Sequence, residues 1–131
     1  MNRILDRDGN TLVEYDGELR LVSFDSAILP GAVFERSSLE GAHFAEANLT
    51  GANFRYADLY WADFFRTNLE GSDLEGADLR GADLREAKLK GANLQGADLG
   101  LDNLAGSTRL HGADLRKTNL CGTKLTGQAT Q

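Results

Sequence analysis

The stretch GSDLE GADLR GADLR EAKLK GANLQ GADLG, residues 71–100, repeats one five-residue pattern without interruption. Each unit holds a small residue, then Asp, Asn or Lys, then Leu. A period of five fits neither a helix, with about 3.6 residues per turn, nor a flat strand, with a period of about 2. A fixed short repeat of this kind predicts a chain that coils and stacks on itself.

We take the Leu or Phe of each unit as its centre. Centres run in steps of five from Leu19 to Leu104 and, after a one-residue slip, from Leu110 to Leu125. The small residue two positions before a centre shares its face in an extended segment, and the residue between them points to water. The remaining two residues, often ending in Gly, turn the chain. Each unit is therefore expected to form one side of a closed polygon with Leu, Phe and Ala inside.

This pattern resembles the pentapeptide-repeat family, whose consensus is A(D/N)LxX, and the resemblance covers residues 19–127. It implies an all-β, right-handed quadrilateral β-helix with four units per coil and about five coils. With four sides per coil, Phe34 should lie under Phe54, and Phe44 under Phe64. The resemblance also implies partners, because members that inhibit or protect DNA gyrase are dimers joined at their C-terminal ends.

The chain divides into residues 1–18, 19–127 and 128–131, expected as an N-terminal hairpin cap, the β-helix and a C-terminal tail. Apolar residues on both sides of Asp8-Gly9-Asn10 predict the hairpin, which would cover the open edge of the first coil. The tail is too polar to cover a core. Two explanations stay open: an end-to-end homodimer through the C-terminal coil, or a natural chain that continues past Gln131.

Composition excludes several functions. The 131 residues carry a net charge of −6, which disfavours direct nucleic-acid binding. Cys121 is the one cysteine, so a reducing compartment is expected, and without an apolar leader or spanning segment we predict a cytoplasmic protein with no membrane contact. His43 and His111 fall on different sides, and no catalytic or metal-binding motif occurs. We therefore expect no enzyme activity, no metal and no cofactor.

The slip lies in LDNLAGSTRLHGADL, residues 101–115. Asp102 occupies a normally small interior position, and six residues rather than five separate Leu104 from Leu110. We expect a local bulge at residues 105–108, with Asp102 accepting hydrogen bonds from its backbone amides.

Aromatic residues gather in FRYADLYWADFFR, residues 54–66. They take turn positions that elsewhere hold mostly Gly or charged residues, so they should face outward along one coil. Exposed aromatics beside Arg are typical of protein interfaces. The main hypothesis is therefore a non-enzymatic, rigid protein-interaction module with an unidentified protein partner; the alternative for these residues is local packing along the corners. The predicted contact residues are Tyr56, Tyr60, Trp61, Phe65 and Arg66.

The alternative function is an acidic DNA mimic that binds a topoisomerase (gyrase-type) or another DNA-binding enzyme. Its acidic face would be made of Asp58, Asp78 and Asp98 on one side and Asp63 and Asp83 on the next. Duplex DNA presents about 15 charges over a rod of roughly 25 Å, far more than the net −6 of this chain. A simpler role for the Asp side chains is to accept hydrogen bonds from turn amides.

Overall fold

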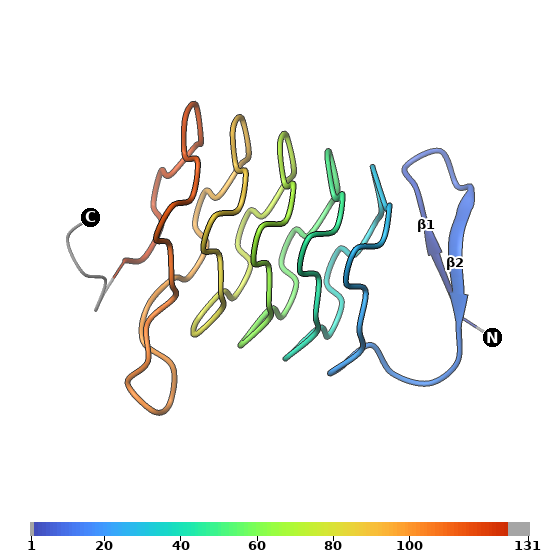
Figure 1. Ribbon diagram of the computed structural model, residues 1–131, viewed down its shortest axis with the longest axis horizontal. Helices are drawn as coiled ribbons and strands as arrows, with labels where there is room; N and C mark the ends of the chain where they lie inside the picture. Colours follow the sequence, from blue (N-terminus) through green and yellow to red (C-terminus); the bar gives the residue numbers. More distant parts are fainter. Residues whose placement is uncertain (1, 126–131) are drawn as a thin grey trace.

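A computed structural model describes residues 2–125 as a hairpin followed by a stack of four-sided coils (Figure 1). The hairpin strands β1 (Asn2–Leu5) and β2 (Thr11–Tyr15) pair antiparallel, with a bulge between Ile4 and Leu5. Each side of a coil contributes one short parallel bridge to the next coil. No helix occurs among the described residues. The tail expected at residues 128–131 lies outside this range.

The hairpin closes one end of the stack, as Figure 1 shows at the N-terminus. Ile4 is buried in the same apolar core as the coils. The Leu5 carbonyl accepts a hydrogen bond of 2.8 Å from the Val33 amide, and Arg7 donates one of 2.8 Å to the Gly51 carbonyl. The expected hairpin cap is thus confirmed. It covers an edge that would otherwise leave strand amides and apolar side chains in water.

The coil repeat is fixed by backbone pairing. Parallel bridges join residues 20 positions apart, for example Asp58 with Asp78 and Asp63 with Asp83. The Asp78 amide donates to the Ala57 carbonyl in the coil before, and the Leu79 amide donates to the Asp98 carbonyl in the coil after. Because each side satisfies its backbone groups through both neighbours, four five-residue sides per coil are confirmed.

The core contains the Leu, Phe and Ala residues that the repeat predicts. Phe34 stacks on Phe54 with ring centroids 5.0 Å apart, and Phe44 stacks on Phe64 at 5.1 Å. Phe44 meets Phe54 edge to face at 5.7 Å, so the two aromatic columns contact each other. Both predicted stacks are confirmed. Beyond Phe64 the buried centres are Leu.

The predicted one-residue slip is wrong. Bridges that span 20 residues up to Asp63–Asp83 span 26 residues from Asp83–Arg109 onward, so six residues are inserted at one corner. Leu104 is not a centre, because its side chain is 77% exposed. An antiparallel bridge between Leu101 and Ser107 closes the insertion. We call residues 101–106 the corner loop; it projects from the stack in orange in Figure 1.

One interior hydroxyl lacks a partner. Ser72 is buried at a small interior position, and its Oγ makes no hydrogen bond to the residues that the structure describes. Thr67, one unit earlier, donates from Oγ1 to the Phe44 carbonyl at 2.7 Å. We expect Ser72→Ala to raise the free energy of unfolding by about 1 kcal/mol, because it removes a buried hydroxyl without a partner. Urea unfolding measures this change. The matched variant Thr67→Ala should lower stability, and equal effects of the two would contradict the assignment.

Candidate functional site

The predicted contact residues all lie at corners, but the structure does not gather them into one patch. Tyr56 occupies one corner, Tyr60 and Trp61 the next, and Phe65 and Arg66 the one after. Only Tyr60 and Trp61 meet, with ring centroids 4.7 Å apart. In a four-sided coil the first and third of these corners are diagonal to each other. The middle corner is therefore the one that combines aromatic side chains.

The outer two corners use their aromatics for packing within the chain. The Arg36 guanidinium lies 4.8 Å from the centre of the Tyr56 ring. The guanidinium groups of Arg66 and Arg85 lie 5.0 and 5.3 Å from the centre of the Phe65 ring. These are cation–π distances, and they match the local packing that the sequence offered as the alternative for these positions.

The middle corner holds the corner loop. Trp61 donates from Nε1 to Asp102 Oδ2 at 2.7 Å. The Tyr60 hydroxyl donates to Asn103 Oδ1 at 2.6 Å and accepts from the Asn103 amide at 2.7 Å. The aromatic pair thus holds a segment more than 40 residues away in sequence. The sequence alone did not reveal this contact, because residues 101–106 resemble part of a regular side.

Asp102 organises the corner loop from within. Its Oδ1 accepts from the amides of Leu104 at 2.8 Å and Gly106 at 2.7 Å. The predicted acceptance of backbone amides is confirmed, but the side chain lies in the loop and not at an interior position. The Trp61 hydrogen bond holds the pKa of Asp102 below its ordinary value, and the two amides act in the same direction against desolvation. The carboxylate is therefore ionised at neutral pH.

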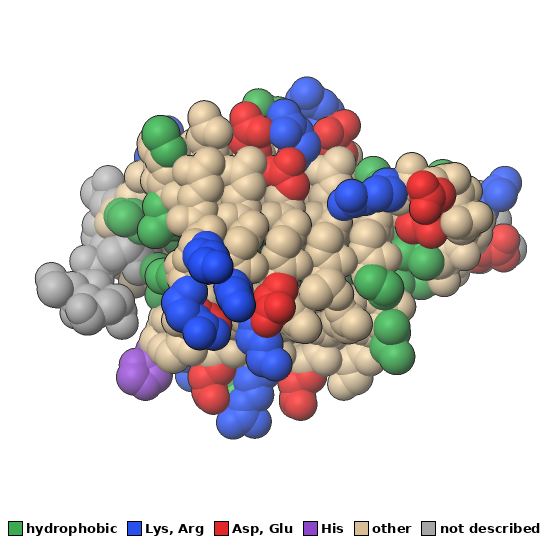
Figure 2. All heavy atoms as spheres, turned by 90° about the horizontal axis from the view of Figure 1, so that it is seen from above, with side chains coloured by type: hydrophobic (Ala, Val, Ile, Leu, Met, Phe, Trp, Pro, Cys, Tyr) green, Lys and Arg blue, Asp and Glu red, His purple; other side chains and the backbone are tan. Residues whose placement is uncertain are grey.

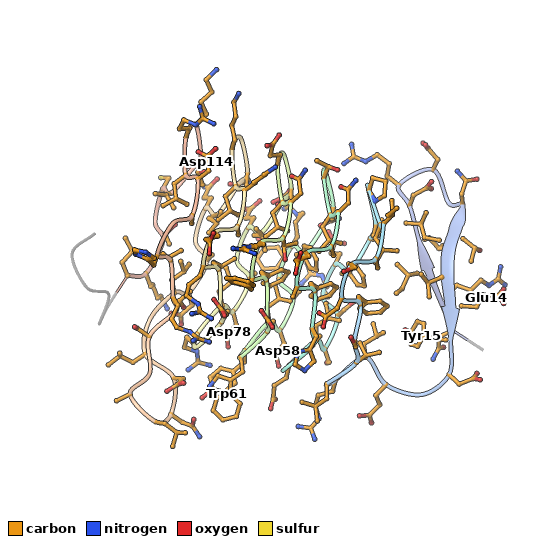
Figure 3. All side chains as sticks on the ribbon, in the orientation of Figure 1. Glu14, Tyr15, Asp58, Trp61, Asp78 and Asp114 are labelled. Atoms are coloured by element: carbon orange, nitrogen blue, oxygen red, sulfur yellow. The ribbon has the colours of Figure 1, made fainter. Side chains whose placement is uncertain are left out.

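Exposed apolar side chains follow this corner along the rod. We define the Trp61 corner as the turns at residues 20–21, 40–41, 60–61 and 80–81 together with the corner loop. Leu21 is 62% exposed and lies over Gly41, Trp61 is 41% exposed, and Leu101 and Leu104 are exposed in the loop. Figure 3 shows Trp61 at the lower edge of the rod, beside the loop. A contiguous exposed apolar surface of this kind is typical of interaction sites.

Trp61 has a costly backbone conformation. Its φ is 60°, in the left-handed region that costs a non-glycine residue roughly 1 kcal/mol. The equivalent residues in the adjacent coils are Gly41 and Gly81. The chain thus carries its only Trp where glycine would be less strained.

Gly81 lets the indole lie on the next coil. A Cβ at Gly81 would overlap Trp61 and lie 2.8 Å from Asp102 Oδ2. We expect Gly81→Ala to displace the indole, weaken the Trp61–Asp102 hydrogen bond and lower the free energy of unfolding by about 2 kcal/mol. Trp fluorescence and urea unfolding measure both effects. Gly71→Ala is the matched control, because Gly71 has a similar φ of +67° and a Cβ added there would meet nothing within 4 Å. Similar losses in the two variants, with unchanged fluorescence, would contradict the role of Gly81.

The predicted Asp ladders are present on the two faces that meet at the Trp61 corner. Asp58, Asp78 and Asp98 pair in successive coils on one face, and Asp63 pairs with Asp83 on the other. Each carboxylate accepts the amide two residues later; Asp58 Oδ1, for example, accepts from Tyr60 N at 3.1 Å. The ladders therefore satisfy turn amides.

Arginine neutralises part of each ladder. Arg80 binds Asp78 with both Nε and Nη2, at 2.9 and 2.7 Å. Arg85 binds Asp83 in the same way, at 2.9 and 2.8 Å. Burial raises the pKa of both carboxyls, but the arginine hydrogen bonds, turn amides and cationic charges outweigh it and leave each pKa lowered. On the face in Figure 2, basic and acidic side chains also lie interleaved. Such pairing weakens a DNA-like row of charge.

The described residues offer little chemistry beyond binding. They contain no group of three or more His, Cys, Asp or Glu that could hold a metal. His43 and His111 lie on different coils, and Cys121 is exposed. Within residues 2–125 there is also no helix that could cross a membrane.

Two solved structures share the fold. The pentapeptide repeat protein from the Arabidopsis thaliana thylakoid lumen is 27% identical over 77% of this chain and 63% of that chain, with a TM-score of 0.57. This chain therefore spans less than two thirds of that relative. Rfr23 from the cyanobacterium Cyanothece 51142 is 24% identical over 82% and 86%, with a TM-score of 0.59, which shows the fold alone. Because one relative is luminal, the cytoplasmic location stays a prediction.

A weaker likeness bears on the DNA-mimic hypothesis. The plasmid-mediated fluoroquinolone resistance protein QnrB1 is 19% identical over 84% of this chain and 86% of that chain. Its TM-score of 0.41 is too low to support an argument. No curated protein sequence matches the chain.

The family comparison agrees with the observed coils. The family model for pentapeptide repeats matches residues 18–55, 36–71, 62–100 and 107–127, with eight copies. The match stops before the corner loop and resumes directly after it. The expected fold class, a right-handed quadrilateral β-helix, is confirmed. The chain belongs to the pentapeptide repeat family.

Proposed function

We propose that the chain is a non-enzymatic, rigid protein-interaction module that contacts its partner at the Trp61 corner. The observation that carries the proposal is the hold of Tyr60 and Trp61 on the corner loop, which presents Leu104 at 77% exposure. A loop fixed in this way loses little conformational entropy on binding. Aromatic and apolar side chains on a rigid frame are typical of the centres of interfaces.

The proposal narrows the contact predicted from sequence. Tyr56 and Phe65 already lie beneath guanidinium groups of their own chain, whereas Leu104 and part of Trp61 face solvent. Tyr60 supports the corner loop. Arg66 pairs with Glu86 at 3.4 Å and belongs to the next corner.

The proposal is tested by affinity capture from host lysate, with washes at low and high salt. The baits are wild type, the double variant Tyr60→Ser/Trp61→Ser, which loses the hold on the loop, and Leu104→Ser, which keeps it. We expect a partner that wild type retains through high salt and that both variants lose. Mass spectrometry of the retained proteins measures this.

The matched control is Ile28→Ser, which removes a side chain with 76% exposure far from the Trp61 corner. It should retain the partner. Loss of the partner by this control, or its retention by both corner variants, would refute the proposed contact. Thermal unfolding of every bait excludes a general loss of fold.

The alternative, an acidic DNA mimic that binds a topoisomerase or another DNA-binding enzyme, has less support. Asp78 and Asp83 are paired with arginine, so they present little free charge to a DNA-binding surface. A mimic would release its partner steeply with salt, because its attraction is screened over about 10 Å at 0.1 M salt. The high-salt wash therefore separates the two functions.

We also propose that two copies associate end to end through the C-terminal coil. Leu120 and Leu125 are exposed in the last coil that the structure describes. Light scattering over a range of concentrations should show a dimer, and Leu120→Lys should favour the monomer. A monomeric mass at every concentration would refute the association without affecting the proposed contact.

A further inference from the structure

Trp61 differs from the other outward aromatics in having no cation of its own. Tyr56, Tyr60 and Phe65 each have a guanidinium between 4.8 and 5.3 Å from the ring centre. Within residues 2–125, no such group lies over the Trp61 ring. Trp binds cations more strongly than Tyr or Phe does. The chain thus leaves its best cation-binding ring partly open to solvent.

Two carboxylates that form no ion pair with Lys or Arg flank this ring. Asp58 lies three residues before Trp61 and Asp63 two residues after it, on the two faces that meet at the corner. Among the described residues the one ion-pair contact of either carboxylate is with His43, whose Nδ1 lies 3.9 Å from Asp63 Oδ2. In the next coil, the equivalent Asp78 and Asp83 are both bound by arginine. The negative charge around Trp61 is therefore available to a partner.

Apolar side chains lie directly beside this acidic pair. Leu101 and Leu104 extend from the corner loop, which Asp102 and Trp61 hold in place. In Figure 3, Asp58 lies near Trp61 in the lower half of the rod, whereas Asp114 lies at the opposite edge. An aromatic ring, two carboxylates without arginine or lysine and two exposed leucines thus occur together at one corner.

We infer that the Trp61 corner binds a cationic amphipathic segment of a partner protein. An Arg or Lys of that segment lies against the Trp61 indole between Asp58 and Asp63, and apolar side chains of the same segment pack on Leu101 and Leu104. This inference rests on the proposed function and specifies the chemistry of the partner. The complementary charges set the orientation of the segment, and the leucines provide contact that salt does not screen.

The test uses synthetic helical peptides and the fluorescence of Trp61, the only Trp in the chain. One peptide has a Leu face and a Lys face, a second replaces Lys with Glu, and a third replaces Leu with Ser. We expect only the Leu/Lys peptide to bind and to change the fluorescence. The variant Asp58→Asn/Asp63→Asn should weaken its binding about tenfold, through loss of cation-binding charge at two positions. Leu104→Ser should also weaken it.

The matched control is Asp73→Asn/Asp114→Asn, which changes the net charge equally on the two other faces. It should bind the Leu/Lys peptide as wild type does. Equal weakening in the control, equal binding of the Leu/Glu peptide, or no binding of the Leu/Lys peptide would each overturn the inference. If the inference fails in this way while wild type still captures a partner that Tyr60→Ser/Trp61→Ser loses, the proposed function stands and only the partner chemistry is wrong.

Discussion

Ala77→Glu is expected to lower the free energy of unfolding by about 4 kcal/mol or more, enough to prevent stable folding. Ala77 is fully buried and lies in a column with Ala57 and Ala97. The core around it is apolar, so a carboxylate there would find no cation. Burial of an unpaired charge and overpacking of a filled interior both contribute to this loss. A domain has only about 5–15 kcal/mol of stability in total.

Far-UV circular dichroism during urea unfolding measures the effect. Ser38→Glu is the matched control, because Ser38 is exposed at an outward position of the same face. It should change stability by less than about 0.5 kcal/mol. If both variants unfolded at the same urea concentration, the assignment of inward and outward positions would be wrong.

Phe54→Ala is expected to cost about 3–5 kcal/mol. The Phe54 ring is fully buried and contacts Phe34, Phe44 and Phe64 at centroid distances of 5.0, 5.7 and 5.7 Å. Removal of the ring leaves a cavity among three other rings, and the stacked coils cannot collapse into it without breaking their backbone pairing.

Phe54→Leu is the matched control for this cavity. The residue 20 positions later, Leu74, occupies the same column and is fully buried, so the coil accepts Leu at this position. The expected cost is below about 1.5–2 kcal/mol. Urea unfolding compares the two variants. Equal losses for Ala and Leu would show that the aromatic contacts, and not the filled volume, determine stability here.

The repeat was predictable because one residue type decides each position. Large and small residues alternate with outward Asp or Asn so regularly that the stacks of Phe34 on Phe54 and Phe44 on Phe64 follow from sequence alone. The corner loop was not predictable in this way. Asn103-Leu104 has the local form of a repeat unit and continues the period of five through residues that leave the coil.

The outcome at the corner loop depends on contacts that no local pattern contains. Asp102 gains hydrogen bonds from Trp61, Leu104 and Gly106 outside the coil, and none of these is available in the narrow interior. Thr108 takes the interior position instead and donates to the Leu79 carbonyl at 2.6 Å. The only sequence signal was the presence of Leu101 and Asp102 where a turn residue and a small residue are usual.

The corner loop has a consequence for how such proteins acquire new specificities. The coils on both sides of the six added residues pair as regularly as those elsewhere, because the addition falls at a turn and leaves every side intact. Length at a corner is therefore uncoupled from the structure of the rod. Segments of other lengths and sequences should be transferable to this position, which makes the turn between residues 99 and 107 a natural place to graft a recognition loop onto an otherwise unchanged scaffold.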